Sequence, residues 1–327
     1  TEISKNPLHM LGFKKIFKVE NQNSEYKFSR NDIKSSQLGK GITGSVDLYQ
    51  SKTLPRFQYA VKTYYTKDIH ESKKDYKTRV LYEYLILSEL SHCNIIKIYD
   101  YDVSFSGSTI KLFLELGTAN LNQLIIKQTN TFNINEMLCI WKLITNAVNY
   151  LHELDICHRD LKLENVVFDV NYKLIKVIDF ATAQKLNNDE LSRGLVGSES
   201  YTAPETYSSI QYDGKSSDVW SLGIILCYLI NKKQPWKLAM WSNSDYQQFI
   251  NQDNFLQEPY FVDFPVESLL LTSQILEQDP LRRIKINDFF SDKWFSLIQY
   301  CGCGVAGGGI DNKTCGIDHG KSFRVKT

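Results

Sequence analysis

The sequence is poor in proline and glycine and carries almost no net charge. Its 327 residues include 7 prolines and 17 glycines, which excludes a collagen-like chain or one that is mostly disordered. Lysine and arginine number 38 and aspartate and glutamate 37, so a formal charge of +1 gives no overall field that would attract nucleic acid. We therefore expect a folded protein without a nucleic-acid partner, long enough for two hydrophobic cores.

Long hydrophobic runs are absent too. The longest, Leu222–Ile230, has about half of the roughly 20 residues that a membrane-spanning helix requires, so we expect a buried helix and no transmembrane segment. No secretory signal is visible and the 7 cysteines are an odd count, so we expect a reducing, cytoplasmic location. The chain begins without methionine, which leaves open whether it is a fragment of a longer protein. Buried thiols are expected at Cys93, Cys139, Cys157 and Cys227.

The pattern of the chain changes near Glu115–Thr118. Before this point the segments are short and rich in β-formers, with one helical stretch at about 78–90. After it helical periodicity dominates, as over Met137–Leu154, where apolar residues form one stripe. We therefore expect an α+β fold with a small β-rich lobe, which contains one key helix, and a larger, mainly α-helical lobe. The expected parts are an extension at 1–30, a domain at 31–298 with lobes at about 31–116 and 117–298, and a flexible Gly/Cys-rich tail at 299–327.

A glycine-rich segment over residues 39–46 reads GKGITGSV, with Gly39, Gly41 and Gly44 at fixed spacing. Glycine lets backbone amides approach phosphate groups without a Cβ in the way. A dinucleotide-binding fold uses the same spacing, but there the motif opens a helix, whereas β-prone residues follow it here. The segment therefore favours a hairpin that covers phosphates.

A lysine ends the apolar segment Ala60-Val61-Lys62. Its aliphatic stem can be covered by the core if its ammonium group meets an acid, and Glu83, in the expected helix, can supply one. The ammonium would hold the α- and β-phosphates, and Glu83 would hold the ammonium. The alternative for Glu83 is a solvated position on an exposed helix face.

A polar loop lies between an expected long helix and an expected strand, and it reads HRDLKLEN over residues 158–165. Asp160 can accept the proton of an incoming hydroxyl, and Asn165 offers an amide oxygen to a metal ion. Asp179, which ends the next strand, is the second expected ligand, because phosphoryl transfer needs positive charge that bridges the phosphates. ATP and Mg²⁺ are therefore the expected cosubstrate and metal.

With these motifs the chain resembles the eukaryotic protein kinase family over about residues 33–298. The resemblance implies a bilobal protein-kinase fold and an ion pair between Glu205 and Arg283. It also implies that a buried Asp218 anchors the catalytic loop and that His158 is a scaffold residue rather than a base. The further matching segments are Ala203-Pro204-Glu205, Ser217–Gly223 and Asp279–Arg283.

The resemblance also implies which residues bind ATP. Adenine would lie between Val46, Ala60 and Val167, with backbone hydrogen bonds at Glu115 and Leu116. The catalytic residues would be Asp160, Lys162, Lys62 and Glu83, and the full nucleotide-binding set would be Leu38, Gly39, Gly41, Gly44, Val46, Ala60, Lys62, Glu115, Leu116 and Val167.

Lys162, two residues after Asp160, is typical of kinases that act on serine and threonine, and Gly197–Tyr201 resembles the matching substrate-docking segment. Ser198 would hydrogen-bond Asp160 and Lys162. A tyrosine kinase would have a different loop, and small-molecule kinases lack this substrate platform, which ends at Glu205. We therefore expect protein substrates with serine or threonine acceptors, and the sequence predicts no oligomeric state.

Glu164 could attract a basic residue upstream of the acceptor, because a carboxylate beside a groove favours cations. The family's second acidic position is Asn120 here, so this preference would be weak.

Two readings of the activation segment stay open. Arg159, Arg79 and Lys185 could bind a phosphate on Ser192, the nearest acceptor, or the segment could be held open without phosphate. Ala181 replaces the glycine of the family's Asp-Phe-Gly motif, which should restrict movement between loop states without removing the metal ligand.

Within the family, Tyr212–Gly214 and Gln234–Ala239 resemble fungal kinases that regulate plasma-membrane nutrient and cation transporters, the halotolerance and nitrogen-permease-reactivator group. The alternative is a calcium/calmodulin-kinase-like or energy-sensing kinase. The first resemblance implies signalling that controls nutrient or ion transport. The alternative to an active enzyme is a pseudokinase or scaffold module that docks partners with little turnover.

The C-terminal residues Cys301, Cys303, Cys315 and His319 have the spacing C-x-C-x11-C-x3-H and could bind zinc. The intervening glycines are unlike a preformed site, so a flexible tail is the main expectation and a metal site the alternative.

Overall fold

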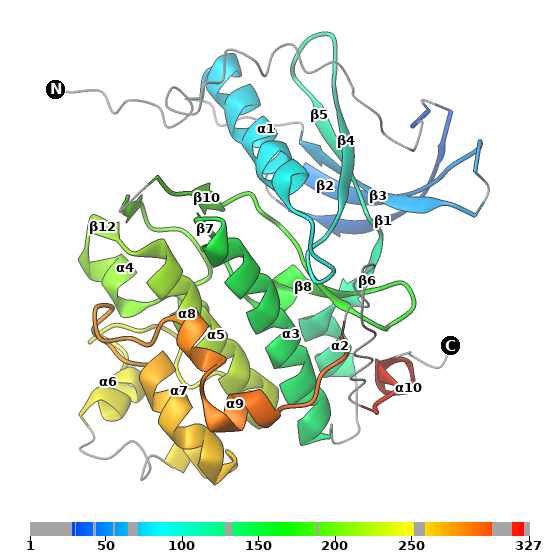
Figure 1. The fold of residues 1–327 in the computed structure, drawn as a ribbon. Coiled ribbons are helices and arrows are strands. Elements are labelled where there is room, and N and C mark those ends of the chain that lie inside the picture. The colour runs from blue at the N-terminus through cyan, green and yellow to red at the C-terminus, as the bar shows by residue number, and fades with distance from the viewer. Residues whose placement is uncertain are drawn as a thin grey trace, which may run out of the picture. The chain divides into compact units, whose positions relative to one another are not determined.

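The computed structural model describes residues 28–29, 31–41, 44–54, 56–64, 71–127, 133–187, 190–251, 259–302 and 316–323 (Figure 1). These residues divide into two compact units. Described residues up to Leu90 and Lys97–Leu116 form the first, and Ser91–Ile96 with the residues from Gly117 onward form the second. The last division follows Leu116, inside the stretch where the sequence pattern changes.

The first unit is a five-stranded antiparallel sheet with one long helix (Figure 1). The helix α1 (Lys73–Glu89) packs against β4 and β5. Alternate residues of β5 are buried, as expected for a strand with one face on a core. In spatial order the strands are β1 (Ile33–Lys40), β2 (Gly44–Gln50), β3 (Gln58–Tyr64), β5 (Ile110–Leu114) and β4 (Ile98–Val103).

The helix α1 begins earlier than the expected stretch at 78–90. Ser72 caps it, since its hydroxyl oxygen accepts a hydrogen bond from Asp75 N at 3.1 Å, and such a cap stabilises a helix by about 1 kcal/mol. Val80 and Leu87 are buried on the inner face. The local cap, rather than the apolar pattern, sets where the helix begins.

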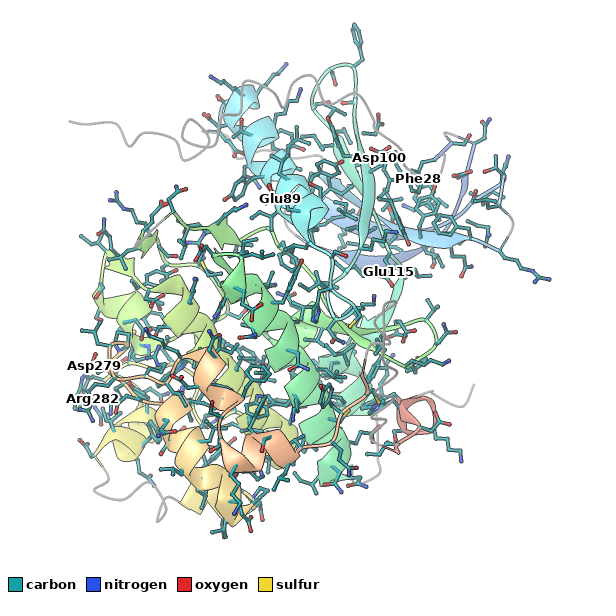
Figure 2. All side chains as sticks on the ribbon, viewed as in Figure 1. Phe28, Glu89, Asp100, Glu115, Asp279 and Arg282 are labelled. Carbon is teal, nitrogen blue, oxygen red and sulfur yellow. The ribbon has the colours of Figure 1, made fainter. Side chains whose placement is uncertain are left out.

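Aromatic rings cover part of the sheet. Phe28 (labelled in Figure 2) stacks on Phe113 with ring centroids 4.5 Å apart. Tyr59 meets Phe28 edge-on at 4.9 Å. Each such pair contributes about 0.5–1.5 kcal/mol beyond the area that it buries. Phe28 lies within the stretch expected as an N-terminal extension, and it packs onto the first unit.

The second unit is mainly helical and is built around α3 (Ile134–Glu153) and α5 (Gly214–Asn231). Trp141 Nε1 on α3 donates to the carbonyl oxygen of Leu222 on α5 at 2.9 Å. The expected buried helix at Leu222–Ile230 is part of α5. The other helices are α2 (Leu121–Lys127), α4 (Pro204–Ser208), α6 (Ser244–Ile250), α7 (Leu269–Ile275), α8 (Ile286–Phe289), α9 (Lys293–Leu297) and α10 (His319–Phe323).

Short strands of the second unit hold its loops in place. Its three small sheets are β6-β8-β9, β7-β10 and β11-β12. The strands are β6 (Gly117–Asn120), β7 (Ile156–Cys157), β8 (Val166–Asp169), β9 (Ile175–Val177), β10 (Gln184–Lys185), β11 (Ser192–Arg193) and β12 (Gln211–Tyr212). The chain is therefore an α+β protein with a β-rich unit followed by a mainly helical one.

The connection between α1 and β4, Ser91–Ile96, belongs to the second unit although the elements on both sides of it belong to the first. Asn94 Nδ2 donates to Ile175 O at 2.9 Å, and Ile96 N donates to Val177 O at 3.0 Å. This connection is therefore hydrogen-bonded to β9 and is not a free loop.

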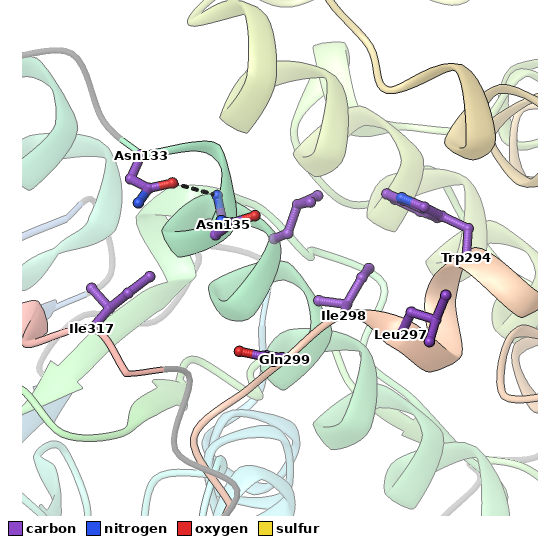
Figure 3. A pocket seen from close by; sticks show the side chains of 8 residues that line it. Asn133, Asn135, Trp294, Leu297, Ile298, Gln299 and Ile317 are labelled. Atoms are coloured by element: carbon purple, nitrogen blue, oxygen red, sulfur yellow. Dashed lines mark hydrogen bonds between the residues drawn. The ribbon is translucent and has the colours of Figure 1, made fainter.

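The C-terminal residues 316–323 also belong to the second unit. Phe323 is fully buried and its ring lies 5.0 Å from that of Phe168. Ile317 lines a pocket with residues of α9 and of the start of α3, among them Asn133 and Trp294 (Figure 3). We expected a flexible tail at 299–327, and for this part of it the structure differs, because apolar residues dock the segment on the helical unit.

Cys139, Cys157 and Cys227 are buried thiols, as expected, whereas Cys93 is disulfide-bonded. Among the described residues, no helix is long and apolar enough to cross a membrane.

Candidate active site

The glycine-rich segment forms a hairpin, not the start of a helix. Strands β1 and β2 pair antiparallel, and Gly41 N donates to Gly44 O at 2.9 Å across the turn. A Cβ on Gly44 would lie 2.2 Å from the carbonyl oxygen of Thr63, so only glycine fits there. Gly39 and Leu38 are exposed on β1. Between the last two glycines, residues 42–43 lie outside the described part of the chain.

The charge pair expected in the first unit is present. Lys62 Nζ on β3 lies 2.9 Å and 3.1 Å from the two carboxylate oxygens of Glu83 on α1. The side chain of Lys62 is 17% exposed and that of Glu83 only 3%, so the lysine keeps some access to solvent while the carboxylate is enclosed. Glu83 is therefore not on a solvated helix face.

A third member of this cluster, Tyr64, was missed from the sequence. Its hydroxyl donates to Glu83 Oε2, and burial together with the charge of Glu83 raises the pKa of this tyrosine. A signal existed, because residues two apart on a strand face the same side, and Tyr64 follows Lys62 by two.

Val46 and Ala60, two of the residues expected around adenine, lie on the neighbouring strands β2 and β3 of the first unit. Val46 is opposite Lys62 in the β2–β3 pair, and Ala60 is opposite Leu114 in the β3–β5 pair. Glu115 N donates to Lys97 O at 2.8 Å, which fixes the backbone just after β5. The last two residues of the expected set are Leu116, at the end of this unit, and Val167, on β8 of the second.

Three polar residues of the second unit converge on one carboxylate, that of Asp160. Lys162 Nζ lies 2.8 Å from Asp160 Oδ2 and 2.7 Å from Ser198 Oγ. Ser198 Oγ donates to Asp160 Oδ1 at 3.0 Å, and Asn165 Nδ2 donates to Asp160 Oδ2 at 3.0 Å. Both oxygens of Asp160 are thus oriented by neighbours, while its side chain stays 14% exposed. The contacts expected of Ser198 with Asp160 and Lys162 are both present.

A buried carboxylate on α5 fixes the backbone of this loop. Asp218 accepts hydrogen bonds from His158 N and Arg159 N, each at 2.8 Å, and lies 3.0 Å from His152 Nε2. Arg159 has a φ of 65°, which is an unfavourable backbone conformation for a residue other than glycine. The hydrogen bonds to Asp218 hold the backbone in this conformation. His158 is fully buried, with Nε2 3.1 Å from Ile178 O, which fits a scaffold role.

Two oxygen-bearing side chains lie on adjoining segments beside Asp160. Ile178 N donates to Asn165 O at 2.9 Å, which brings Asp179 next to Asn165 in space. The amide nitrogen of Asn165 is used toward Asp160, so the amide oxygen is the atom that could bind a metal. An amide oxygen and a carboxylate are hard ligands of the kind that Mg²⁺ prefers, so these donors fit that ion.

Ala181, which stands where the family's Asp-Phe-Gly motif has glycine, is under no backbone strain in this conformation. The positive φ of this segment falls on Asp179, at 63°, and not on Ala181. The expected restriction therefore concerns other loop states, which would require a positive φ at Ala181.

The activation segment differs from one expectation. Ser192 is fully buried, and its hydroxyl lies 3.5 Å from Cys157 Sγ, so this conformation does not present it as a phosphate acceptor. Arg159 donates to the carbonyl oxygens of Thr182 and Arg193, at 2.8 Å and 3.2 Å. In the first unit Arg79 pairs with Glu71 through two hydrogen bonds. In this conformation Arg159 is thus bonded to backbone carbonyl groups of the activation segment.

The carboxylates expected at the substrate platform have different surroundings. Glu205 forms a buried bidentate pair with Arg283, at 2.6 Å and 2.9 Å. Glu164 Oε1 accepts from Asn122 Nδ2 at 2.9 Å, whereas Glu164 Oε2 is buried and has no hydrogen-bond partner among the described residues. An unsatisfied buried carboxylate oxygen costs free energy that a cationic ligand could recover. Asn120 caps the start of α2, where its Oδ1 accepts from Gln123 N.

The comparisons with known proteins agree with this geometry. Residues 33–295 match the protein kinase domain family. In Saccharomyces cerevisiae the chain is similar to serine/threonine-protein kinase PRR2, with 30% identity over 81% of this chain and 42% of that protein. It is also similar to the nitrogen permease reactivator protein, with 35% identity over 68% of this chain and 28% of that protein. With serine/threonine-protein kinase HAL4/SAT4 the identity is 28%, over 82% and 46%.

The fold, the site and the match to the family model define the class of this protein. The chain belongs to the protein kinase domain family. It spans less than half the length of the three yeast relatives.

Proposed function

We propose that this chain transfers the γ-phosphoryl group of ATP to serine and threonine hydroxyls of other proteins. The observation that carries the proposal is the cluster of Asp160, Lys162, Asn165 and Ser198. It presents one carboxylate that is held at both oxygens and still reaches the surface. Such a carboxylate can orient an incoming hydroxyl and take its proton.

Each member of the cluster has a distinct part in this reaction. Asp160 accepts the proton of the acceptor hydroxyl as the new P–O bond forms. Lys162, 2.8 Å away, offsets the charge of Asp160 and of the transferring group. Ser198 joins the activation segment to the same carboxylate, so the substrate platform and the base are set together.

On the nucleotide side, Lys62 would hold the α- and β-phosphates, and Glu83 would keep its ammonium in place. The backbone amides of the hairpin at Gly39, Gly41 and Gly44 would cover the phosphates. Asn165 and Asp179 would hold Mg²⁺, which when bound supplies positive charge that neutralises the phosphates. Adenine would contact Leu38, Val46, Ala60 and Val167, with backbone hydrogen bonds at Glu115 and Leu116.

Glu164 is proposed to select a basic residue upstream of the acceptor. The partial exposure of the Glu164 carboxylate supports this, because a guanidinium or ammonium group could pair with it. A peptide with arginine at that side should show a lower KM than its alanine counterpart, and Glu164→Gln should remove most of the difference. Equal use of both peptides by the unaltered enzyme would contradict the assignment.

The proposed physiological role is signalling that controls nutrient or ion transport from the cytoplasm. Its support is the similarity to a protein named for the reactivation of a nitrogen permease. Phosphoproteomics of cells with intact and Asp160→Ala enzyme tests it: transporter-linked phosphosites should fall in the variant. A set of changed sites without any connection to transport would contradict this role.

The activity itself is tested by phosphate transfer from labelled ATP with the purified chain. We expect transfer to serine or threonine peptides, a loss on the order of 10²–10⁴-fold in Asp160→Ala, and no change in the surface control Asp263→Ala. ATP binding without turnover would instead identify a scaffold. Activity unaffected by both Asp160→Ala and Lys62→Ala would reject the assigned roles.

A further inference from the structure

Three metal-binding side chains from distant parts of the sequence meet beside the helical core of the second unit. Cys139 lies on α3, His319 opens α10, and Cys301 follows α9. The ring atom His319 Nε2 lies 3.7 Å from Cys139 Sγ and 3.5 Å from Cys301 Sγ. Ligand atoms of the three residues all fall within 4.8 Å of one another.

These separations match a tetrahedral zinc site. With Zn–S bonds of about 2.3 Å and a Zn–N bond of about 2.0–2.1 Å, a tetrahedral angle places sulfur and nitrogen about 3.6 Å apart. The two measured S···N distances, 3.7 Å and 3.5 Å, lie on either side of that value. Both S···N separations are therefore those expected of ligands to a single zinc ion.

A carboxylate behind the histidine orients its ring. Glu136, one helical turn before Cys139 on α3, has Oε1 2.7 Å from His319 Nδ1, and it is 2% exposed. A hydrogen bond at Nδ1 leaves Nε2 as the atom for the metal, and carboxylate–histidine–zinc arrangements of this kind are common. Glu136 thus fixes which nitrogen of His319 points at the two sulfur atoms.

A buried lysine fixes the chain just before Cys301. Lys142, also on α3, donates to the carbonyl oxygens of Phe295 and Ile298, at 2.7 Å and 2.9 Å. These bonds anchor the chain just before Cys301. Nearby, Ile317 and Ile298 line the pocket at the start of α3, so the segments that carry Cys301 and His319 converge on the same helix (Figure 3).

Burial of the site is also suitable. Cys139 is fully buried and His319 is 2% exposed, whereas Cys301 is partly exposed and leaves a route for an ion. Thiolate and imidazole together favour zinc over magnesium or calcium, which prefer oxygen ligands.

We propose that Cys139, Cys301 and His319 bind a structural zinc ion that fastens the C-terminal segment to the helical unit. The sequence pattern suggested Cys301, Cys303, Cys315 and His319 as ligands, and Cys139 was not among them. Cys303 and Cys315 lie outside the described residues. Three protein ligands leave the fourth tetrahedral position to water or to another side chain.

The rival interpretation needs no metal. His319 can be an imidazolium that donates from Nδ1 to Glu136 and from Nε2 to the sulfur atoms of the two cysteines. Burial by itself lowers the pKa of His319, but its contacts with Cys301 and Glu136 raise it to about 9. Metal content and spectroscopy separate the two interpretations.

The test uses the full chain, purified under reducing conditions and dialysed against a weak chelator. We expect about one bound zinc per chain by mass spectrometry, and with Co²⁺ in its place the absorption bands of a tetrahedral thiolate complex. Cys139→Ser, Cys301→Ser and His319→Ala should each lose the bound ion and these bands. The matched control is Cys227→Ser, another fully buried cysteine on a core helix, which should keep both.

Glu136→Gln sharpens the result, since it should weaken zinc affinity by about 10–100-fold while the Co²⁺ spectrum keeps its tetrahedral form. If Cys139→Ser does not fold, Cys301→Ser carries the test, because that position is partly exposed. A chain that holds no zinc and gives no Co²⁺ bands would overturn the proposal. So would zinc that Cys301→Ser and His319→Ala retain at full affinity.

Discussion

Two buried carboxylates, one in each unit, hold different kinds of partner. Glu83 in the first unit receives two side chains, the ammonium of Lys62 and the hydroxyl of Tyr64. Asp218 in the second receives two backbone N–H groups and lies against one imidazole. The first therefore aims a cation that stays partly exposed, whereas the second fixes the path of the chain.

Both carboxylates are buried, but the groups that they bind give them different roles. A carboxylate that pairs with a side chain can direct charge toward a ligand, as Lys62 retains 17% exposure. A carboxylate that takes up backbone donors stabilises a strained conformation, here the positive φ of Arg159. Loss of Glu83 should thus appear in activity, and loss of Asp218 in stability and in activity together.

The largest effect is expected for Asp218→Asn. The NH₂ group of asparagine would face one of the groups from which Asp218 now accepts a hydrogen bond. A buried partner left unpaired in this way costs about 3–5 kcal/mol. Urea unfolding followed by tryptophan fluorescence measures the loss. Asp213→Asn is the matched control, because it makes the same change on α5 at an exposed helix cap where asparagine serves equally well. Equal stability of the two variants would contradict the anchoring role.

The next effect concerns Lys62→Met, which removes the charge proposed to hold phosphate. We expect kcat/KM to fall by about 10²–10³-fold, with a far-ultraviolet circular dichroism spectrum like that of the unaltered chain. Adding Glu83→Gln to this variant should cost little more activity, because Glu83 is proposed to act through Lys62. Losses that simply add in the double variant would refute that dependence.

The smallest effect is expected for Tyr64→Phe. Glu83 would lose one hydrogen bond and keep its ion pair, so the free energy of unfolding should fall by about 1 kcal/mol. Activity should fall less than it does in Lys62→Met. Tyr49→Phe on the neighbouring strand serves as the control for removal of a hydroxyl from the same sheet. A larger activity loss in Tyr64→Phe than in Lys62→Met would contradict this ranking, because the tyrosine hydroxyl would then matter more for activity than the lysine ammonium.

Much of this arrangement could be predicted from the sequence, because each chemical group follows from a local motif. The periodicity over Met137–Leu154 identified a core helix, and the loop at 158–165 carried its polar residues at fixed spacing. The contact of Lys62 with Glu83 was expected because a lysine on an apolar strand needs an acid. These are short-range signals, or pairs that one chemical need connects.

What the sequence could not give depends on contacts between distant segments. Cys139 meets His319 across 180 positions, and no periodicity or spacing relates them. The full burial of Ser192 follows from packing against Cys157 and Gly214, which local polarity does not indicate. Asn94 likewise donates from its amide to Ile175 O, which lies 81 positions away.

The position of Ser91–Ile96 has a consequence for how the domain is made on the ribosome. This connection emerges well before its partners, since Asn94 must wait for Ile175, 81 positions later. A nascent chain that has been synthesised as far as β5 still lacks β9, the strand with which this connection pairs. The amino-terminal unit is therefore complete in sequence before the connection between α1 and β4 can pair with β9.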